Sequence, residues 1–151
     1  DLPGEKYLLY VPNTDHGLNT IDVPLSLIAY LDAFLNCRPR PRFSWEVDRP
    51  NGVLRLTTVD PPEQVRLWKA TNPIARDFRL EALGPAWTSE PAAGDDGVYT
   101  VAMPQPEQGF TAFFLEMTYP SGGRLPFTFT TEVVVTPDVY PFGPPPGRVV
   151  Q

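Results

Sequence analysis

The sequence predicts a mixed fold, in which a short α/β segment precedes an all-β sandwich. Three observations predict it. Residues 5–11 end in a continuous apolar run, residues 27–35 carry apolar side chains at helical spacing, and residues 42–136 alternate between apolar and polar side chains. A continuous run is typical of a strand buried on both faces, and alternation is typical of strands with one solvent-facing side.

The N-terminal segment is expected to hold one strand, residues 5–11, and one helix. The turn residues 12–17 follow the strand. The helix is predicted from a single apolar stripe, whose members are Leu27, Ile28, Leu31, Phe34 and Leu35. Thr20 or Asp22 can cap its N-terminus, and Pro39 prevents it from continuing.

The remainder of the chain predicts seven short strands separated by turn residues. They are residues 42–47, 53–59, 64–70, 76–82, 97–103, 110–119 and 127–136. The sixth should bury Phe113, Leu115, Met117 and Tyr119, and the seventh Phe127, Phe129, Val133 and Val135. Seven alternating strands at this spacing favour a β-sandwich of immunoglobulin or fibronectin type.

These elements divide the chain into residues 1–38, the end of an α/β domain, residues 39–136, the sandwich, and a Pro-rich tail at residues 137–151. A lone strand and helix have apolar faces with nothing to bury them. We therefore expect the partner strands to lie upstream in a longer parent protein. The start at Asp1, without Met or a signal peptide, is consistent with that expectation.

Composition restricts the partners. The net charge of −6 argues against nucleic acid, since a phosphate-binding face is basic. No apolar run reaches the roughly 18 residues of a membrane span, so no transmembrane helix is expected. The single cysteine, Cys37, cannot form an internal disulfide. The 20 prolines favour short strands and turns over long helices.

His16 is the candidate catalytic residue. It is the single histidine of the chain and lies in a loop between an apolar strand and an amphipathic helix. That order matches the histidine loop of α/β-hydrolases, in which the imidazole takes a proton from a serine and returns it to the leaving group. The alternative is a loop histidine with an ordinary hydrogen bond, and the residues by themselves leave both open.

The nucleophile of such a site is missing from this sequence. Gly-x-Ser-x-Gly does not occur, and none of the four serines, which are Ser26, Ser44, Ser89 and Ser121, follows a strand and precedes a helix. Asp15 precedes His16, but sequence neighbours usually point apart. We interpret Asp15 as a polar loop residue and expect the triad carboxylate upstream.

No cofactor or metal is expected. One His and one Cys do not make a zinc site, and Asp95-Asp96 is more simply a solvated turn. Trp45, Trp68 and Trp87 are interpreted as core residues of the sandwich and not as sugar-stacking platforms, with Trp87 suited to packing against the neighbouring domain.

Four segments resemble the PhoPQ-activated pathogenicity-related protein family. They are Tyr10-Val-Pro-Asn-Thr-Asp-His-Gly-Leu18, Val65-Arg-Leu-Trp-Lys-Ala-Thr-Asn-Pro-Ile-Ala-Arg-Asp-Phe-Arg79, Gly84-Pro-Ala-Trp-Thr-Ser89 and Phe110-Thr-Ala-Phe-Phe-Leu-Glu-Met-Thr-Tyr-Pro-Ser121. The resemblance implies a secreted or periplasmic bacterial protein with an α/β-hydrolase domain and a β-rich C-terminal domain. The histidine of the motif corresponds to His16, whereas the serine and acid of the family correspond to no residue of this sequence.

Two functions from different classes follow. The first is a hydrolase fragment that supplies the triad histidine, with the absent N-terminal hydrolase domain as its partner and an unknown substrate. The second is a non-enzymatic secreted protein whose sandwich binds a protein or glycan. The charges of residues 76–81 either dock the hydrolase domain by ion pairs or face solvent.

Overall fold

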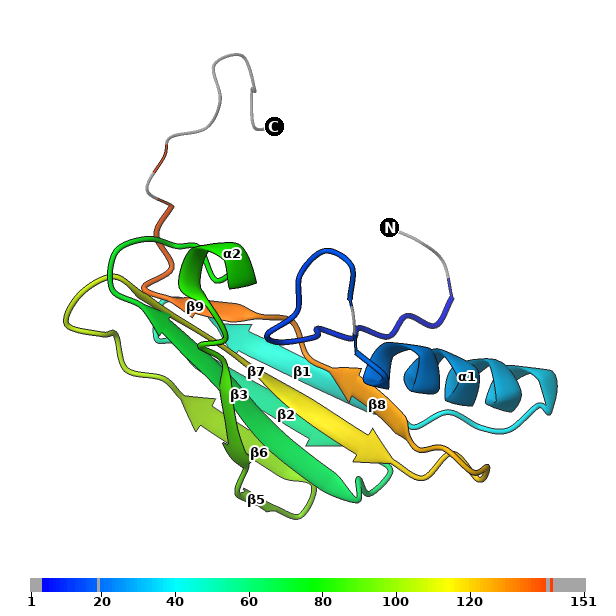
Figure 1. The fold of residues 1–151 in the computed structure, drawn as a ribbon. Helices are drawn as coiled ribbons and strands as arrows, with labels where there is room; N and C mark the ends of the chain where they lie inside the picture. The colour runs from blue at the N-terminus through cyan, green and yellow to red at the C-terminus, as the bar shows by residue number, and fades with distance from the viewer. Residues whose placement is uncertain (1–3, 19, 141, 143–151) are drawn as a thin grey trace.

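The computed structural model describes residues 4–18, 20–140 and 142, and it shows a sandwich of two antiparallel sheets (Figure 1). One sheet has the order β1 (Phe43–Asp48), β2 (Val53–Thr58), β6 (Val98–Ala102) and β5 (Gly94–Asp95). The other has the order β4 (Thr88–Pro91), β3 (Gln64–Asn72), β7 (Phe110–Tyr119) and β8 (Phe127–Thr130), and β9 (Val134–Thr136) also pairs with β7. The described helices are α1 (Asp22–Leu35) and α2 (Leu80–Leu83).

The core lies between the two sheets and follows the predicted alternation. In β7, the side chains of Phe113, Leu115, Met117 and Tyr119 are buried, which confirms the face predicted for this strand. Leu54 and Leu56 of β2 enclose them from the opposite sheet. Each such side chain contributes about 1.5–3 kcal/mol when it is fully removed from water.

The predicted strand over residues 127–136 is divided into β8 and β9, and its second half faces the other way from the prediction. Thr130 pairs with Glu116 and Val134 pairs with Phe113, so three residues of this segment lie opposite two of β7. The extra residue is a bulge, held where the Leu115 N–H donates to the Thr131 hydroxyl at 3.1 Å. Because one added residue shifts the face, Val134 is buried in place of the predicted Val133 and Val135.

The predicted strand over residues 76–82 is wrong: this segment is a turn followed by α2. The buried side chain of Asn72 ends β3, because its Oδ1 accepts the N–H groups of Ile74 and Ala75 at 2.9 and 3.1 Å. Its Nδ2 donates to the Asp77 carbonyl at 2.7 Å. This local turn competes with strand formation, as asparagine often does. The short strands β4 and β5 were not predicted, and Ser89 lies in β4.

The charged side chains of this segment pair locally instead of alternating along a strand. Arg79 donates from Nε and Nη2 to the Asp77 carboxylate at 2.9 and 2.6 Å. Arg76 lies 3.6 Å from the Asp138 carboxylate and stacks over the Tyr140 ring at 4.2 Å. These contacts join the turn to the segment that follows β9.

The Asp77 pair predicts an acid-sensitive contribution to stability. The hydrogen bonds from the Arg79 side chain and backbone lower the pKa of Asp77 from 3.8 to about 2. A lowered folded-state pKa stabilises the fold above pH 3.8, and this contribution is lost as the pH falls toward 2. We expect Asp77→Asn to lower the melting temperature at pH 6 more than at pH 2. A difference between variant and wild type that stays constant over this range would contradict the assignment.

Helix α1 forms where the apolar stripe predicted it, but it packs through its opposite side. Its N-cap residue is Ile21, which makes no side-chain cap bond, so neither Thr20 nor Asp22 is the N-cap residue. Ala29 and Ala33 are buried where α1 lies against β8 (Figure 1). The small side chains allow this close approach, and they leave the large side chains of the stripe on the outer side.

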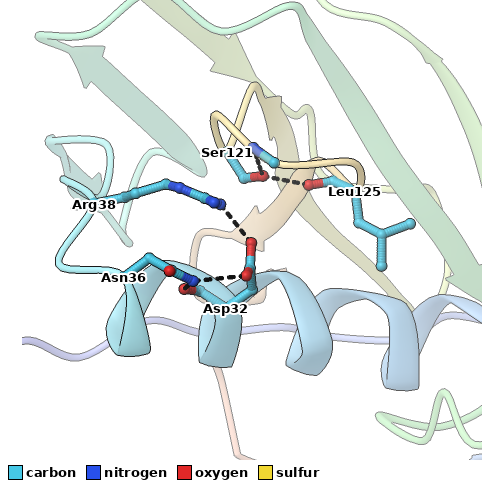
Figure 2. A network of polar contacts seen from close by, with 6 residues as sticks. Asp32, Asn36, Arg38, Ser121 and Leu125 are labelled. Atoms are coloured by element: carbon cyan, nitrogen blue, oxygen red, sulfur yellow. Dashed lines mark hydrogen bonds and ion pairs between the residues drawn. The ribbon is translucent and has the colours of Figure 1, made fainter.

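Polar contacts join the C-terminal end of α1 to the chain that follows it. Figure 2 shows that Asp32 forms an ion pair with Arg38 and accepts a hydrogen bond from the side-chain amide of Asn36. The hydrogen bond from Asn36 is 2.9 Å long. The turn between β7 and β8 lies beside them, closed by the buried Ser121 hydroxyl, which donates to the Leu125 carbonyl. The polar contacts thus close the C-terminal end of α1 and the adjacent turn, while Ala29 and Ala33 pack the helix on the sandwich.

The predicted strand over residues 5–11 is reduced to one isolated antiparallel bridge, between Leu8 and Thr130. The Tyr7 ring enters the core and stacks on Phe129 at 4.3 Å between ring centres. The Tyr10 N–H donates to the Thr130 hydroxyl at 3.1 Å. The segment thus follows the edge of β8 without forming a ladder with it. Most of the predicted tail, residues 141 and 143–151, lies outside the described residues.

Candidate functional site

His16 lies in an exposed loop before α1, and the loop is folded by its own side chains. The Thr14 hydroxyl donates to the Val11 carbonyl at 2.9 Å. The Gly17 N–H donates to Asp15 Oδ1 at 2.8 Å, and the Leu18 N–H donates to the Asp15 carbonyl at 3.1 Å. Asp15 therefore organises the turn around His16. Within the described residues, the His16 imidazole has no hydrogen-bond partner and is exposed to solvent.

Asn13 connects this loop to the sandwich through two hydrogen bonds. Its Oδ1 accepts the Trp87 N–H at 3.0 Å, and its Nδ2 donates to the Trp87 carbonyl at 2.9 Å. The side-chain amide thus pairs with a backbone unit as a neighbouring strand would. Asn13 has a φ of 57°, a left-handed conformation that asparagine adopts more readily than most residues.

Trp87 is itself held firmly on the outer face of the sheet. Its indole N–H donates to the Phe78 carbonyl at 3.2 Å, and its ring lies 5.4 Å from the ring centre of Phe114. The ring of Tyr10, which directly precedes Val11, lies 5.9 Å from the same Phe114 ring. The loop is consequently attached to one aromatic cluster both before and after Val11.

Within the part of the chain that the structure describes, none of the four serines is hydrogen-bonded to His16. Ser26 lies in α1 and Ser44 in β1, where its side chain is exposed. Ser89 accepts hydrogen bonds from the Arg66 guanidinium at 3.0 and 2.7 Å, and Ser121 closes its own turn. Ser89 and Ser121 therefore make structural hydrogen bonds, and the catalytic role of His16 stays a prediction.

Of the tryptophans predicted to be core residues, Trp45 packs against the core between the sheets, whereas Trp68 and Trp87 gather around Phe114, outside that core cluster. Trp45 packs near Phe43 and donates from Nε1 to Glu132 at 3.2 Å, and Trp68 stacks on Phe114. Trp87 packs on the sandwich itself, and it also contacts the N-terminal segment through Asn13. Among the residues that the structure describes, no three metal-ligating side chains come together, and none of the helices could cross a membrane.

A cavity of about 290 Å³ lies between the loop, α1 and the second sheet. It is lined by Tyr10, Pro12, Ser26, Trp68 and Thr128, among others. The buried Trp68 Nε1 has no hydrogen-bond partner within the described part of the chain. The lining is mixed, with apolar side chains such as Leu9 and Val11 beside the polar Thr20 and Glu116.

The apolar face of α1 is uncovered and follows the loop in the chain. We define it by Leu27, Ile28, Leu31, Phe34 and Leu35, which are between 54% and 70% exposed. Leu8, Leu27 and Tyr30 border a second cavity of about 360 Å³ that continues from this face. These five side chains recur at helical spacing, so they share one face of α1.

The sequence pattern identified the apolar stripe and His16, but it missed the pairing of Asn13 with Trp87. The turn residues Pro12-Asn13 predicted a loop only. Nothing in the spacing indicates a contact across 74 positions, and only the packing of the sheet brings the two together.

Comparisons with known proteins place these features in a family. The family model described as "PhoPQ-activated pathogenicity-related protein" matches residues 1–79. A curated relative, "Autocrine proliferation repressor protein A" of Dictyostelium discoideum, is 30% identical over 164 residues. That alignment covers 92% of this chain and 33% of the relative, so the chain spans about a third of the relative's length. No solved structure matches.

Proposed function

Since the chain belongs to the PhoPQ-activated pathogenicity-related protein family, we propose that it is the C-terminal part of a secreted or periplasmic α/β-hydrolase-like protein. In this proposal, His16 is the histidine of a Ser-His-acid triad. The observation that carries it is one juxtaposition: the His16 loop precedes a helix whose large apolar side chains are uncovered.

The chemistry assigned to His16 is general acid–base catalysis of acyl transfer. A neutral imidazole removes the proton from the serine hydroxyl as that oxygen attacks an ester or amide carbonyl, and then protonates the leaving group. The exposed position of His16 leaves both nitrogens accessible to groups from outside the described residues. The serine and the orienting carboxylate are assigned to the preceding part of the parent protein.

The apolar face of α1 is the proposed contact with that preceding domain. The opposite side of α1 is already buried through Ala29 and Ala33, so the helix is apolar on two sides. Two apolar sides favour a helix that packs between two surfaces, here the sandwich and the preceding domain. Full burial of a large apolar side chain contributes about 1.5–3 kcal/mol, and covering the 54–70% that is exposed on each of these five would add the corresponding part.

The sandwich is assigned an accessory role. Its strand order, β1-β2-β6-β5 against β4-β3-β7-β8, supports the proposed immunoglobulin or fibronectin type. It provides the surface on which the His16 loop rests, through Asn13 and Trp87.

The test is reconstitution from two parts. The N-terminal region of the parent protein and this chain are expressed together and separately, and hydrolysis of p-nitrophenyl acetate is measured. We expect turnover from the complex and the intact parent, and none from this chain alone. Turnover by the isolated chain that is lost in His16→Ala would contradict the two-part site.

A second function is carried by the relative's name, which describes a proliferation repressor. In this alternative the hydrolase-like domain is inactive, and the sandwich of the secreted protein binds a protein or glycan partner. An activity-based fluorophosphonate probe distinguishes the two, because it labels only an activated serine. Absence of labelling of the intact parent protein would favour the binding function.

The uncovered face predicts that the chain self-associates when it is alone. Leu31→Lys places a charge at the centre of the face and should shift the chain toward monomer in gel filtration with light scattering. Ile74→Lys is the matched control, since Ile74 is 90% exposed but lies apart from α1 in the turn after β3. A wild-type chain that is monomeric at high concentration would count against the docking surface.

A further inference from the structure

We infer that Asn13 is a positioning residue, which fastens the loop of the catalytic histidine to the β-sandwich through the backbone of Trp87. The inference rests on the proposed function of His16 and extends it. It assigns the sandwich a part in the geometry of the site, in addition to its accessory role.

The first argument is the form of the contact. Asn13 both accepts from and donates to the same residue, at 3.0 and 2.9 Å. Only a carboxamide supplies a donor and an acceptor side by side, so aspartate, serine or leucine cannot reproduce the pair. The positive φ of 57° adds a second requirement, which asparagine and glycine meet with least strain. Glycine lacks the amide, so the two requirements together select asparagine.

The second argument is the rigidity of the anchor. The Trp87 indole is fixed by its hydrogen bond to the Phe78 carbonyl and by its contact with Phe114. Phe114 is buried in β7, the strand to which both β3 and β8 pair. The anchor, which directly precedes β4, therefore packs on the strand that pairs with β3, β8 and β9.

The third argument is the short distance along the chain from the anchor to His16. Asn13 is three positions before the histidine, and Thr14 and Asp15 fill the interval with hydrogen bonds inside the turn. Tyr10 holds the start of the loop on the same aromatic cluster. A displacement at Asn13 is consequently transmitted to the imidazole, and small displacements of a catalytic group are costly.

The test uses two variants and one control. Asn13→Gly removes both hydrogen bonds and still permits a positive φ, whereas Asn13→Asp keeps the acceptor and loses the donor. Asn51→Ala is the control, because Asn51 is another turn asparagine whose Nδ2 donates to Asp48 at 2.8 Å, far along the chain from the loop.

The first measurement is amide hydrogen exchange in the 151-residue chain. In Asn13→Gly, the Trp87 amide loses its acceptor, and its exchange should accelerate by about tenfold or more, together with residues 12–18. Asn51→Ala should leave these amides unchanged. Unchanged protection of the Trp87 amide in Asn13→Gly would overturn the inference.

The second measurement is steady-state hydrolysis of p-nitrophenyl acetate by the intact parent protein. Both Asn13 variants should lower kcat, Asn13→Gly by about 10²-fold, while KM and the melting temperature stay close to wild type. If Asn13 had only a structural role, its variants would lower the melting temperature and would not lower kcat selectively while KM stays unchanged. An active wild type with unchanged kcat in Asn13→Gly overturns the inference alone. An inactive wild type overturns the proposed function and, with it, the positioning role.

Discussion

Replacing His16 by alanine in the intact parent protein is expected to lower kcat for p-nitrophenyl acetate by about 10⁶-fold. Without the imidazole, the serine hydroxyl keeps its proton and is a weak nucleophile at neutral pH. The fold should be unaffected, because the His16 side chain is exposed and contacts no other described residue through a hydrogen bond. Far-ultraviolet circular dichroism and the melting temperature check this directly.

Asp15→Asn is the matched control for His16→Ala. The Asp15 carboxylate accepts the Gly17 N–H within the turn, and an asparagine Oδ1 accepts the same bond. We expect this variant to keep most of the activity, since the orienting carboxylate is assigned to the preceding domain. A loss as large as that of His16→Ala would instead identify Asp15 as the acid of the triad. Full activity in His16→Ala would remove His16 from the mechanism.

Replacing Phe113 by alanine is expected to destabilise the chain by about 3–5 kcal/mol. Phe113 is 0% exposed and lies at the centre of β7, opposite Val134 and Lys69. The substitution removes the aromatic ring from water-excluded space and leaves a cavity that the two sheets cannot close, because each is held by its own ladder. Urea denaturation followed by tryptophan fluorescence measures the change.

Phe34→Ala provides the comparison for Phe113→Ala. It removes the same atoms from a side chain that is 62% exposed on the apolar face of α1. In the isolated chain, the free energy of unfolding should change by less than about 0.5 kcal/mol. In the intact parent protein, the same variant should become destabilising if the face is buried there. Equal effects of Phe34→Ala in both contexts would argue that no domain covers α1.

Much of the sandwich could be predicted from the sequence because its strands bury one face. A period of two in β7 is sufficient to place Phe113, Leu115, Met117 and Tyr119 in the core. The seventh predicted strand shows where this reasoning fails. One extra residue at Thr131 reversed the orientation of everything after it, and a bulge has no signature in the pattern of apolar residues.

The turn after β3 shows a different limit. Residues 76–82 alternate like a strand, but the Asn72 side chain satisfies the next backbone donors locally. Both a strand and such a turn are compatible with the local residues, so the outcome depends on packing. The candidate site was likewise only partly predictable from the sequence. His16 was identifiable by its place between an apolar run and a helix, whereas Asn13 was not distinguishable from any other turn residue.

The sequence by itself determined the alternation of the strands, the apolar stripe of α1, the presence of one histidine and the absence of a nucleophile motif. These depend on residue type and local spacing. The tertiary structure alone decided which side of α1 is buried, because both sides are apolar. Only the side with the small residues Ala29 and Ala33 fits closely against β8. It also decided that the His16 loop rests on Trp87, since that contact joins positions 74 residues apart and exists only once the second sheet has formed.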